Sequence, residues 1–436
     1  MADTLQLQVY QILGRLFSPV VPKVWTEDEC LRQRLGHASV ERPPGLLIWI
    51  HGVSLGETLA ALPLAEHCLA AIPSAHVLMT TVTQAGMDLL RRRRPERASC
   101  QFLPLDTPQA VGRFWSHWRP DAGIFLEGEL WPTLIHTAQA NKCPLVFVNA
   151  RMGPRSFRRW SYPFLRPLVR EMLQRFHVIC PIDTHEAIRL QLLGASAGQI
   201  RFAGDLKYAS AGYAVSPPAT DEPIRAAAGR PIWIASSTHE GEEEVICSVH
   251  LQLSPTLPAL LTVLAPRHPA RCATVAAMLQ RAGLTVARRS LGAAITPKVN
   301  VYLVDTLGEL ATLYALAPVA FVGGSLFPHL AGHNLAEPAA SGCALLTGPH
   351  VGHFQGMVRE LGDAVQQLAD AGELSSALQT LFSNSLLLKA RRNTSRETFQ
   401  RLSAQIIQRV WANIAPSLFG PDVHLDESPI TSELRI

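Results

Sequence analysis

Short apolar runs alternate with helix-like segments along most of the chain. In the first half, the runs that predict strands cover residues 46–53, 76–81, 122–127, 144–149 and 177–181. The segments between them, such as TLAALPLAEHCLAAI, have the composition of helices. Short buried strands that alternate with helices are typical of a parallel sheet covered by helices on both faces.

The pattern breaks once and then resumes. The break is a stretch rich in Ala, Pro and Gly, residues 209–231, which predicts a linker. Further strands are predicted at 231–237, 260–266, 300–305, 319–324 and 343–348. The sequence therefore predicts an α/β protein with two Rossmann-like, doubly wound domains that face each other across a cleft. We place the first domain at 1–213, the second at 224–414 and a disordered tail at 415–436.

The amino-acid composition excludes some classes of protein. Of the 436 residues, 47% are hydrophobic and 17% are charged, which excludes a disordered chain. The net charge of +4 is too small to indicate nucleic-acid binding but suits an anionic substrate or a membrane surface. The eight cysteines include no C-x-x-C, so we expect a reducing compartment. The metal-binding motifs D-x-D and H-E-x-x-H are absent, so we expect no metal.

The chain has no clean apolar stretch of 18 residues, so no spanning helix is expected. Its start, LQLQVYQILGRLFSPVVPKVW, predicts a short amphipathic segment. This segment either packs on the first domain or serves as an interfacial membrane anchor, and we favour the packed helix.

The stretch HGVSLGE, residues 51–57, allows three interpretations. It contains G-x-S-x-G, the pattern of a serine nucleophile, with Ser54 at its centre. It also contains S-x-x-E, in which Ser54 caps a helix and Glu57 reaches back to it. The third interpretation makes Glu57 a catalytic base. The residues alone favour capping.

A related turn lies in the second half, in AFVGGSLFPHLAGHNLAEPAASG, residues 320–342. Gly323 and Gly324 permit close approach to a ligand, and the following helix start offers N–H groups to a phosphate. Asn334 and Glu337 form a second possible capping pair, although a carboxylate here could also bind ribose hydroxyls. Since G-x-G-x-x-G and the Walker A motif are absent, neither NAD nor a P-loop triphosphate is indicated.

The stretch 151–176, RMGPRSFRRWSYPFLRPLVREMLQRF, is strongly basic. Seven arginines stand against Glu171, and Phe157, Trp160, Tyr162 and Phe164 are interleaved with them. One interpretation is a solvated helix face. The other is a docking surface for an anionic, partly apolar partner such as a phosphorylated lipid headgroup.

Eight segments in this order resemble one family: HGVSLGE, FLEGELWP, NARMGPRSFRRW, GDLKY, IWIASSTHEGEEE, APRHPAR, DTLGEL and FVGGSLFPHLAGHNLAEPAA. The chain resembles the 3-deoxy-D-manno-octulosonic acid (Kdo) transferases of lipopolysaccharide assembly over roughly residues 46 to 360. The resemblance implies the two-domain GT-B fold and transfer of Kdo from CMP-Kdo to the lipid A precursor, lipid IVA. It also implies inversion at the anomeric carbon, no cofactor or metal, and work at the anionic cytoplasmic face of the bacterial inner membrane.

The resemblance also implies roles for individual residues. Glu57 matches the general base, and Glu127 and Lys207 match the two residues that stabilise the transition state. Ser54 then belongs to the turn. The expected CMP contacts are Pro266, Arg267, Leu307, Gly308, Glu309, Asn334, Leu335, Ala336 and Glu337, to which Gly324 and Ser325 of the glycine turn are added.

This chain departs from the family pattern at several positions. Gly128 stands where a threonine is usual, and Asp205 adds a negative charge beside Lys207. The apolar, basic start typical of the family is weak here, which bears on membrane attachment. Two other functions fit single features of the sequence: a serine hydrolase built on Ser54, and a nucleotide-sugar binding protein without catalysis.

Overall fold

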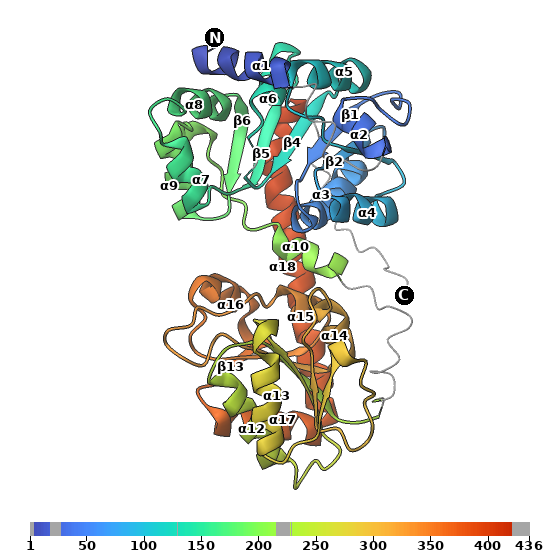
Figure 1. The fold of residues 1–436 in the computed structure, drawn as a ribbon, viewed down its shortest axis with the longest axis vertical. Coiled ribbons are helices and arrows are strands. Elements are labelled where there is room, and N and C mark those ends of the chain that lie inside the picture. Colours follow the sequence, from blue (N-terminus) through green and yellow to red (C-terminus); the bar gives the residue numbers. More distant parts are fainter. Residues whose placement is uncertain (1–3, 18–27, 129, 215–226, 228, 421–436) are drawn as a thin grey trace. The chain divides into compact units, whose positions relative to one another are not determined.

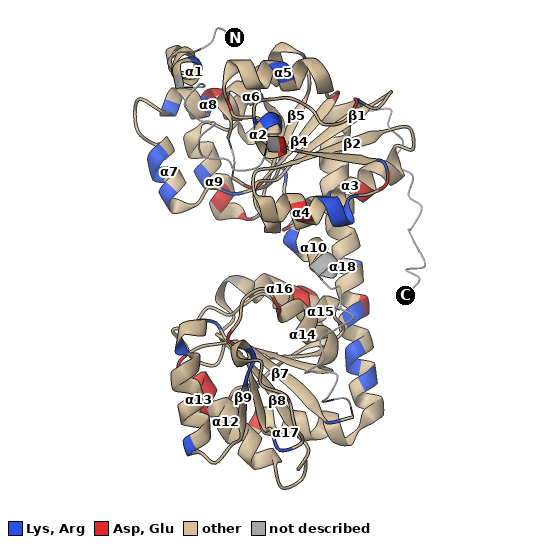
Figure 2. Cartoon of the chain, turned by 45° about the vertical axis from the view of Figure 1, so that its right-hand side comes forward, with Lys and Arg blue, Asp and Glu red and all other residues tan. Residues whose placement is uncertain are grey.

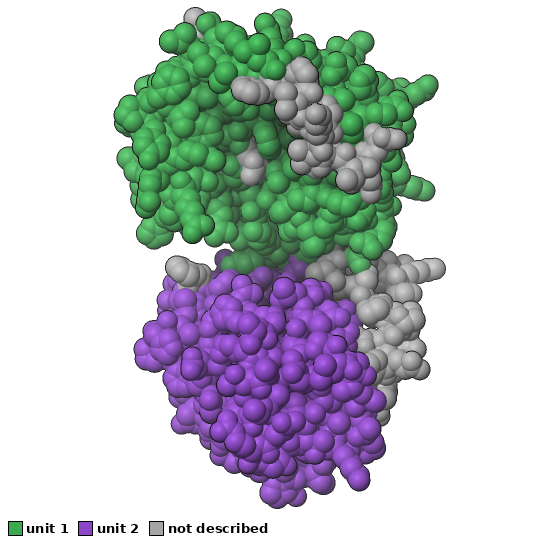
Figure 3. All heavy atoms as spheres, viewed as in Figure 1, with its two compact units in different colours: residues 1–210, 404–436 green, residues 211–403 purple. Residues whose placement is uncertain are grey.

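The computed structural model describes residues 4–17, 28–128, 130–214, 227 and 229–420 (Figure 1). The chain divides into two compact units, one of residues 1–210 and 404–436 and the other of residues 211–403 (Figure 3). Each unit has its own parallel sheet and its own hydrophobic core. This confirms the predicted α/β class with two Rossmann-like domains.

The first unit is built on six parallel strands in the order β3-β2-β1-β4-β5-β6. Their bounds are Leu47–His51 for β1, His76–Thr81 for β2, Ala98–Phe102 for β3, Ala122–Leu126 for β4, Leu145–Ala150 for β5 and Phe176–Pro181 for β6. The first nine helices are α1 (Leu5–Phe17), α2 (Asp28–Arg34), α3 (Leu55–Ala71), α4 (Gln84–Arg93), α5 (Pro108–Trp118), α6 (Pro132–Ala140), α7 (Pro154–Trp160), α8 (Arg166–Gln174) and α9 (Thr184–Leu193).

The strand order of the first unit creates a crossover between β1 and β4. From β1 the chain adds β2 and β3 on one side, and then returns to add β4 on the other side of β1. Open α/β sheets bind ligands at such a reversal, beyond the carboxyl ends of the strands. Burial drives this arrangement, because all five residues of β1 and all five of β4 are buried, as expected for a sheet covered on both faces.

The second unit has seven parallel strands in the order β13-β12-β11-β7-β8-β10-β9. Their bounds are Ile232–Thr238 for β7, Leu261–Pro266 for β8, Val286–Arg288 for β9, Val301–Leu303 for β10, Val319–Val322 for β11, Ala344–Thr347 for β12 and Val365–Gln367 for β13. The helices are α12 (Glu242–Leu253), α13 (Cys272–Arg281), α14 (Leu310–Leu316), α15 (Ala336–Ala340), α16 (Gln355–Leu361) and α17 (Ala371–Ser383). Here the crossover lies between β7 and β11.

All ten strands predicted from the sequence are present, with ends that differ by a few residues. Three further strands, β3, β9 and β13, were not predicted. The last two are only three residues long, and β3 contains the polar residues Ser99 and Gln101. These strands therefore have no apolar run that would distinguish them from the surrounding loops.

Two predicted boundaries differ from the structure. The predicted linker, 209–231, begins inside helix α10 (Lys207–Ala214), and most of its remainder lies outside the described residues. Helix α18 (Ser385–Phe419) runs past the predicted domain end at 414, and the compact second unit ends earlier, at residue 403. The end of α18 belongs to the first unit because Trp411 packs on His67 and Asn413 donates a hydrogen bond to Phe202 O. The predicted disordered tail thus starts inside this helix, and residues 421–436 are not described.

Candidate active site

Glu57 lies at the carboxyl end of β1, in the first turn of α3. Ser54 is the N-cap residue of this helix, and its Oγ accepts a hydrogen bond from Glu57 N at 3.3 Å. The Glu57 side chain reaches back: Oε2 accepts from Val53 N at 2.7 Å, and Oε1 accepts from Ser54 Oγ at 3.0 Å. The capping interpretation is therefore confirmed as geometry. It leaves the carboxylate at the sheet crossover, with 8% of the residue exposed.

The same contacts bear on the serine-hydrolase interpretation. A nucleophilic serine needs a general base within hydrogen-bond reach, which in most serine hydrolases is a histidine. The nearby His51 is fully buried, and its Nδ1 contacts Thr80 Oγ1 at 3.0 Å and Thr80 O at 3.2 Å. Burial lowers the pKa of His51 to about 3. Among the described residues, no histidine hydrogen-bonds to Ser54 Oγ, so this interpretation has no geometric support.

Glu127 follows β4, the strand beside β1. Its backbone is left-handed, with φ of 61°, a conformation that costs energy for a residue other than glycine and is common at functional sites. Its carboxylate forms an ion pair with Lys207, with 2.5 Å between Oε1 and Nζ. The structure thus brings together two of the three predicted catalytic residues, Glu127 and Lys207. Glu127 follows the strand that neighbours the one leading to Glu57.

Lys207 is held in place by contacts of the backbone around it. Asn149, near the end of β5, accepts a hydrogen bond from Leu206 N at 2.9 Å through Oδ1. Asp205 accepts one from Lys207 N at 2.9 Å, at the start of α10. The acidic departure from the family pattern therefore serves as a helix-start acceptor, and Lys207 keeps its partner in Glu127.

In the second unit, the predicted CMP residues follow neighbouring strands. Pro266 ends β8 and is followed by Arg267, whose N–H donates to Thr238 O at the end of β7. Leu307, Gly308 and Glu309 lie between β10 and α14, and Gly324 and Ser325 follow β11. Since β11, β7, β8 and β10 are adjacent in the sheet, these residues share its carboxyl edge.

The glycine turn differs from the expected phosphate site. The N–H groups of Gly324 and Ser325 donate to the carboxylate of Glu242, at 2.6 and 2.9 Å. The Ser325 side chain is also engaged, because its Oγ donates to Val322 O and accepts from Gly348 N, both at 2.8 Å. In this arrangement the N–H groups of Gly324 and Ser325 are therefore engaged by the protein itself, and their contact with a phosphate stays a prediction.

Three histidines lie around this turn. His239 and His333 have stacked rings with 2.9 Å between their Nε2 atoms, and His268 meets His239 edge-on. Burial is the main cause that lowers the pKa of both partners, that of His333 to about 4, and the nearby Arg267 adds to the effect. The contact between the two Nε2 atoms requires one ring to donate and the other to accept.

Glu309 is engaged by a neighbouring arginine. Arg289 binds its two carboxylate oxygens, with Nε–Oε2 at 2.6 Å and a second contact to Oε1 at 2.8 Å. Hydrogen bonds from Arg289 are the main cause that lowers the pKa of Glu309. Leu307 is 81% exposed and Gly308 has φ of 85°, so this loop offers an apolar side chain and backbone groups to a ligand.

The segment 334–337 begins helix α15. Asn334 Oδ1 accepts from Ala336 N at 2.9 Å, which supports half of the predicted capping pair, although Leu335 is the N-cap residue. Within the described part of the chain, no hydrogen bond to the Glu337 carboxylate is found. Burial raises the pKa of Glu337. A partly buried carboxylate with open acceptor sites is suited to binding hydroxyl groups.

The basic segment forms an exposed surface of the first unit. Helix α7 has no buried residue, and the blue of Lys and Arg covers much of its ribbon in Figure 2. Six of the seven arginines are exposed, whereas Arg175 is buried and pairs with Glu171. Tyr162 and Phe164 are also exposed, by 59% and 60%. This surface therefore carries both positively charged and aromatic side chains.

Helix α1 packs on α5, α6 and α8, as the packed-helix interpretation predicts. Leu7 is buried, and Tyr10 hydrogen-bonds to Asp106. Leu5, Ile12 and Leu16, which share one helical face, remain 67%, 54% and 67% exposed. No helix in the described part of the chain has the length and apolar character needed to cross a bilayer.

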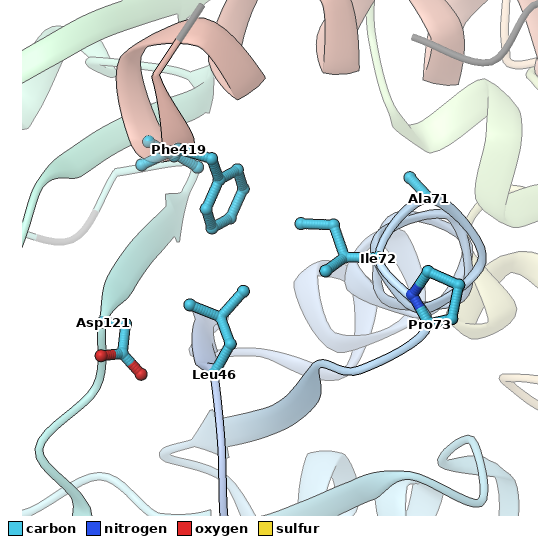
Figure 4. A pocket seen from close by; sticks show the side chains of 7 residues that line it. Leu46, Ala71, Ile72, Pro73, Asp121 and Phe419 are labelled. Atoms are coloured by element: carbon cyan, nitrogen blue, oxygen red, sulfur yellow. The ribbon is translucent and has the colours of Figure 1, made fainter. Parts of the chain in front are cut away.

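A pocket of about 490 Å³ lies elsewhere in the first unit (Figure 4). Leu46, Ile72, Asp121 and Phe419 are among its lining residues. Because Leu46 and Asp121 precede β1 and β4, the pocket is at the amino end of the sheet, opposite Glu57 and Glu127. None of the predicted site residues lines it. Within the described ranges, no cluster of three or more His, Cys, Asp or Glu side chains could hold a metal ion.

Sequence reasoning missed Glu242, His239 and His333 as parts of this site. The segment STHEGEEE was noticed only as one of the family-like blocks. Its acidic run is typical of a solvated helix start, and nothing in the local pattern distinguishes the buried Glu242 from the exposed Glu244. The signal that could have found it is the pairing of this run with a Gly-Gly-Ser turn after another strand.

Comparisons with known proteins identify the family of this chain. The model of the 3-deoxy-D-manno-octulosonic-acid transferase (kdotransferase) family matches residues 29–210. A probable mitochondrial 3-deoxy-D-manno-octulosonic acid transferase of Arabidopsis thaliana is 45% identical, over 87% of this chain and 87% of its own. The 3-deoxy-D-manno-octulosonic acid transferase of Haemophilus influenzae is 34% identical, over 80% and 82%. The Bordetella pertussis enzyme of the same name is 36% identical, over 75% and 77%.

Among solved structures, the UDP-GlcNAc 2-epimerase of Neisseria meningitidis bound to UDP-GlcNAc has a TM-score of 0.53. It is 12% identical and covers 84% of this chain and 100% of its own, which shows a shared fold. The C-terminal CMP-Kdo binding domain of WaaA from Acinetobacter baumannii is 32% identical, over 40% of this chain and 92% of that domain, with a TM-score of 0.39. Given curated relatives above 30% identity over most of their length, the chain belongs to the 3-deoxy-D-manno-octulosonic acid transferase family of glycosyltransferases.

Proposed function

We propose that this Kdo transferase moves Kdo from CMP-Kdo to the lipid A precursor, lipid IVA, with inversion and without a metal or other cofactor. The acceptor hydroxyl oxygen forms a bond to the anomeric carbon of Kdo on the face opposite the phosphate. The bond from that carbon to the phosphate oxygen breaks, CMP leaves, and the hydroxyl proton passes to Glu57.

One observation carries this proposal: Glu57 and Glu127 follow β1 and β4, the two strands at the crossover of the first sheet, and Glu127 pairs with Lys207. Val53 N and Ser54 Oγ donate to the Glu57 carboxylate and fix its orientation. In this proposal the carboxylate takes the proton of the acceptor hydroxyl. Lys207 supplies positive charge for a carboxylate or phosphate of the substrates, and Glu127 orients it.

The second unit holds the donor in this proposal. Arg267 binds the single phosphate of CMP, because a guanidinium gives charge-assisted hydrogen bonds to phosphate oxygens. Glu337 accepts hydrogen bonds from the ribose hydroxyls. Pro266, the loop 307–309 and Asn334 to Ala336 complete the nucleotide contacts. The glycine turn, whose N–H groups bind Glu242, shapes this site and does not bind the phosphate directly.

The acceptor is a lipid with phosphate groups, so the enzyme must reach a membrane surface. We propose peripheral attachment at the cytoplasmic face of the bacterial inner membrane through helix α1 and the basic surface of α7 and α8. The exposed leucines of α1 and the arginines of α8 support this, since these two helices pack against each other.

Incubation of the protein with CMP-Kdo and lipid IVA tests the proposal, with products read by mass spectrometry. We expect release of CMP and a lipid heavier by one or more Kdo units, and the spectrum counts them. Hydrolysis of the lipid without sugar transfer would favour the serine hydrolase. Binding of CMP-Kdo without any product would favour a non-catalytic binding protein.

A further inference from the structure

The first turn of α12 places a carboxylate inside the second unit. Glu242 is fully buried, and its carboxylate accepts four backbone hydrogen bonds. Oε1 accepts from Ser325 N at 2.9 Å and Leu326 N at 3.0 Å. Oε2 accepts from Gly324 N at 2.6 Å and His239 N at 2.9 Å. The charge of Glu242 is therefore matched by donors from two separate loops.

These four N–H groups form an anion-binding concavity. They come from the loops after β7 and β11, the adjacent strands at the crossover of the second sheet. Successive backbone N–H groups in a turn are a common binding site for phosphate. A crossover is also where such sheets bind their ligands. Glu242 thus occupies the position where a ligand phosphate would otherwise meet the backbone.

The glycines of the turn fit this arrangement. A Cβ atom on Gly323 would lie 2.9 Å from Glu242 Oε2, and one on Gly324 would lie 2.6 Å from the ring of His333. Gly324 also has φ of 68°. Both positions therefore need glycine because a side chain would collide with Glu242 or His333, and no ligand is needed to explain the two glycines.

We infer that Glu242 is a specificity-determining residue that makes the donor site accept a nucleoside monophosphate and reject a nucleoside diphosphate. The inference rests on the proposed CMP-sugar donor. A second phosphate that reached the turn would meet the buried negative charge of Glu242 and find no free N–H group. One phosphate avoids this cost, because Arg267, after the neighbouring strand β8, supplies its positive charge.

Calorimetric affinities for CMP and CDP test the inference, since the two ligands differ only by one phosphate. We expect the full-length protein to bind CMP at least about tenfold tighter than CDP. Glu242→Ala empties the concavity, so this ratio should fall at least about tenfold, mainly through tighter CDP binding. Added formate should restore the ratio, because a small carboxylate can refill the vacated position.

Two further variants keep the test decisive if Glu242→Ala does not fold. Glu242→Gln keeps the size and removes the charge, so the ratio should fall in the same direction. Glu244→Gln is the matched control, because Glu244 is exposed in the same helical turn, and its ratio should equal that of the wild type. A folded Glu242→Gln variant with an unchanged ratio overturns the inference, as does a wild type that binds both nucleotides equally.

The outcomes also separate this inference from the proposed function. One outcome is that the wild type and Glu244→Gln transfer Kdo, but the Glu242 variants have the same ratio of CMP to CDP affinity as the wild type. In that case only the specificity role of Glu242 is wrong. If neither the wild type nor the control binds CMP or transfers Kdo, the proposed donor is wrong and the inference is overturned with it.

Discussion

At the residue scale, Glu57 belongs both to the cap of α3 and to the proposed reaction. Glu57→Gln keeps the size, and its amide can still accept from Val53 N and donate to Ser54 Oγ. It cannot take a proton, so the transfer rate should fall at least about a hundredfold. CMP-Kdo affinity and the melting temperature should stay close to those of the wild type. Rates from mass spectrometry and a calorimetric melt measure this.

Ser54→Ala is the control for that variant. It removes the hydroxyl of the cap and costs about 0.5–2 kcal/mol of stability, but it leaves the base in place, so activity should persist. An inactive Ser54→Ala beside an active Glu57→Gln would refute the role of Glu57 and revive the hydrolase.

Glu337 allows a second test at this scale. Its carboxylate is partly buried, and burial raises its pKa. If it accepts hydrogen bonds from two ribose hydroxyls, Glu337→Ala should weaken CMP binding by about 1.5–3 kcal/mol, the usual value for hydrogen bonds to a charged group. Glu397→Ala, an exposed glutamate of the same unit, should leave the affinity unchanged. Equal calorimetric affinities for wild type and Glu337→Ala would remove this residue from the site.

Contacts between residues close in the sequence could be predicted, whereas contacts between residues far apart could not. The Ser54 cap of α3 could be predicted because an N-cap and its partner are only three residues apart. The contact between Glu242 and Gly324 spans 82 residues and depends on the adjacency of β7 and β11. No periodicity within a short window reports such a pairing. The sequence therefore predicted a phosphate contact at this turn but not the Glu242 carboxylate that its N–H groups bind.

At the scale of elements, the apolar runs predicted the central strands because burial on both faces requires an unbroken apolar sequence. The ends of elements were harder to place. Helix α18 continues beyond the predicted domain end at 414, where Ala415 and Leu418 are also buried. The local composition of 415–419 gave no sign of this packing.

Helix α1 and the basic surface together make a prediction about membranes. A single weak signal gives only marginal attachment, whereas two signals give stable attachment. The protein should float with vesicles that contain anionic lipid at low salt and be released at high salt, since salt screens the arginines. The double variant Ile12→Glu with Leu16→Glu should fail to float even at low salt.

Leu386→Glu is the matched control, because Leu386 is 80% exposed but belongs to the second unit. Its flotation should equal that of the wild type. If the wild type fails to float at low salt, the surface of α1, α7 and α8 is not a membrane site, and the protein must meet its lipid acceptor in another way.

At the scale of the whole molecule, α18 is shared by the two compact units, with the division between residues 403 and 404. Its final turns carry Trp411, which is 3% exposed and packs edge-on against His67, with 5.5 Å between ring centroids. The predicted CMP residues all lie in the other unit. A substitution of Trp411 should therefore lower the stability of the first unit and leave nucleotide binding unchanged.

We predict that Trp411→Ala lowers the stability of the first unit by about 3–5 kcal/mol, the usual cost of removing a buried tryptophan. Calorimetric melts with and without saturating CMP can assign the transitions, because a ligand raises the melting temperature of the part that binds it. In Trp411→Ala the CMP-insensitive transition should fall, while the CMP-sensitive transition and the CMP affinity should match the wild type. Leu386→Ala, an exposed leucine on the same helix, should leave both transitions in place. A fall in the CMP-sensitive transition of Trp411→Ala would show instead that the end of α18 supports the nucleotide-binding unit, and the division of the chain at residue 403 would have to be abandoned.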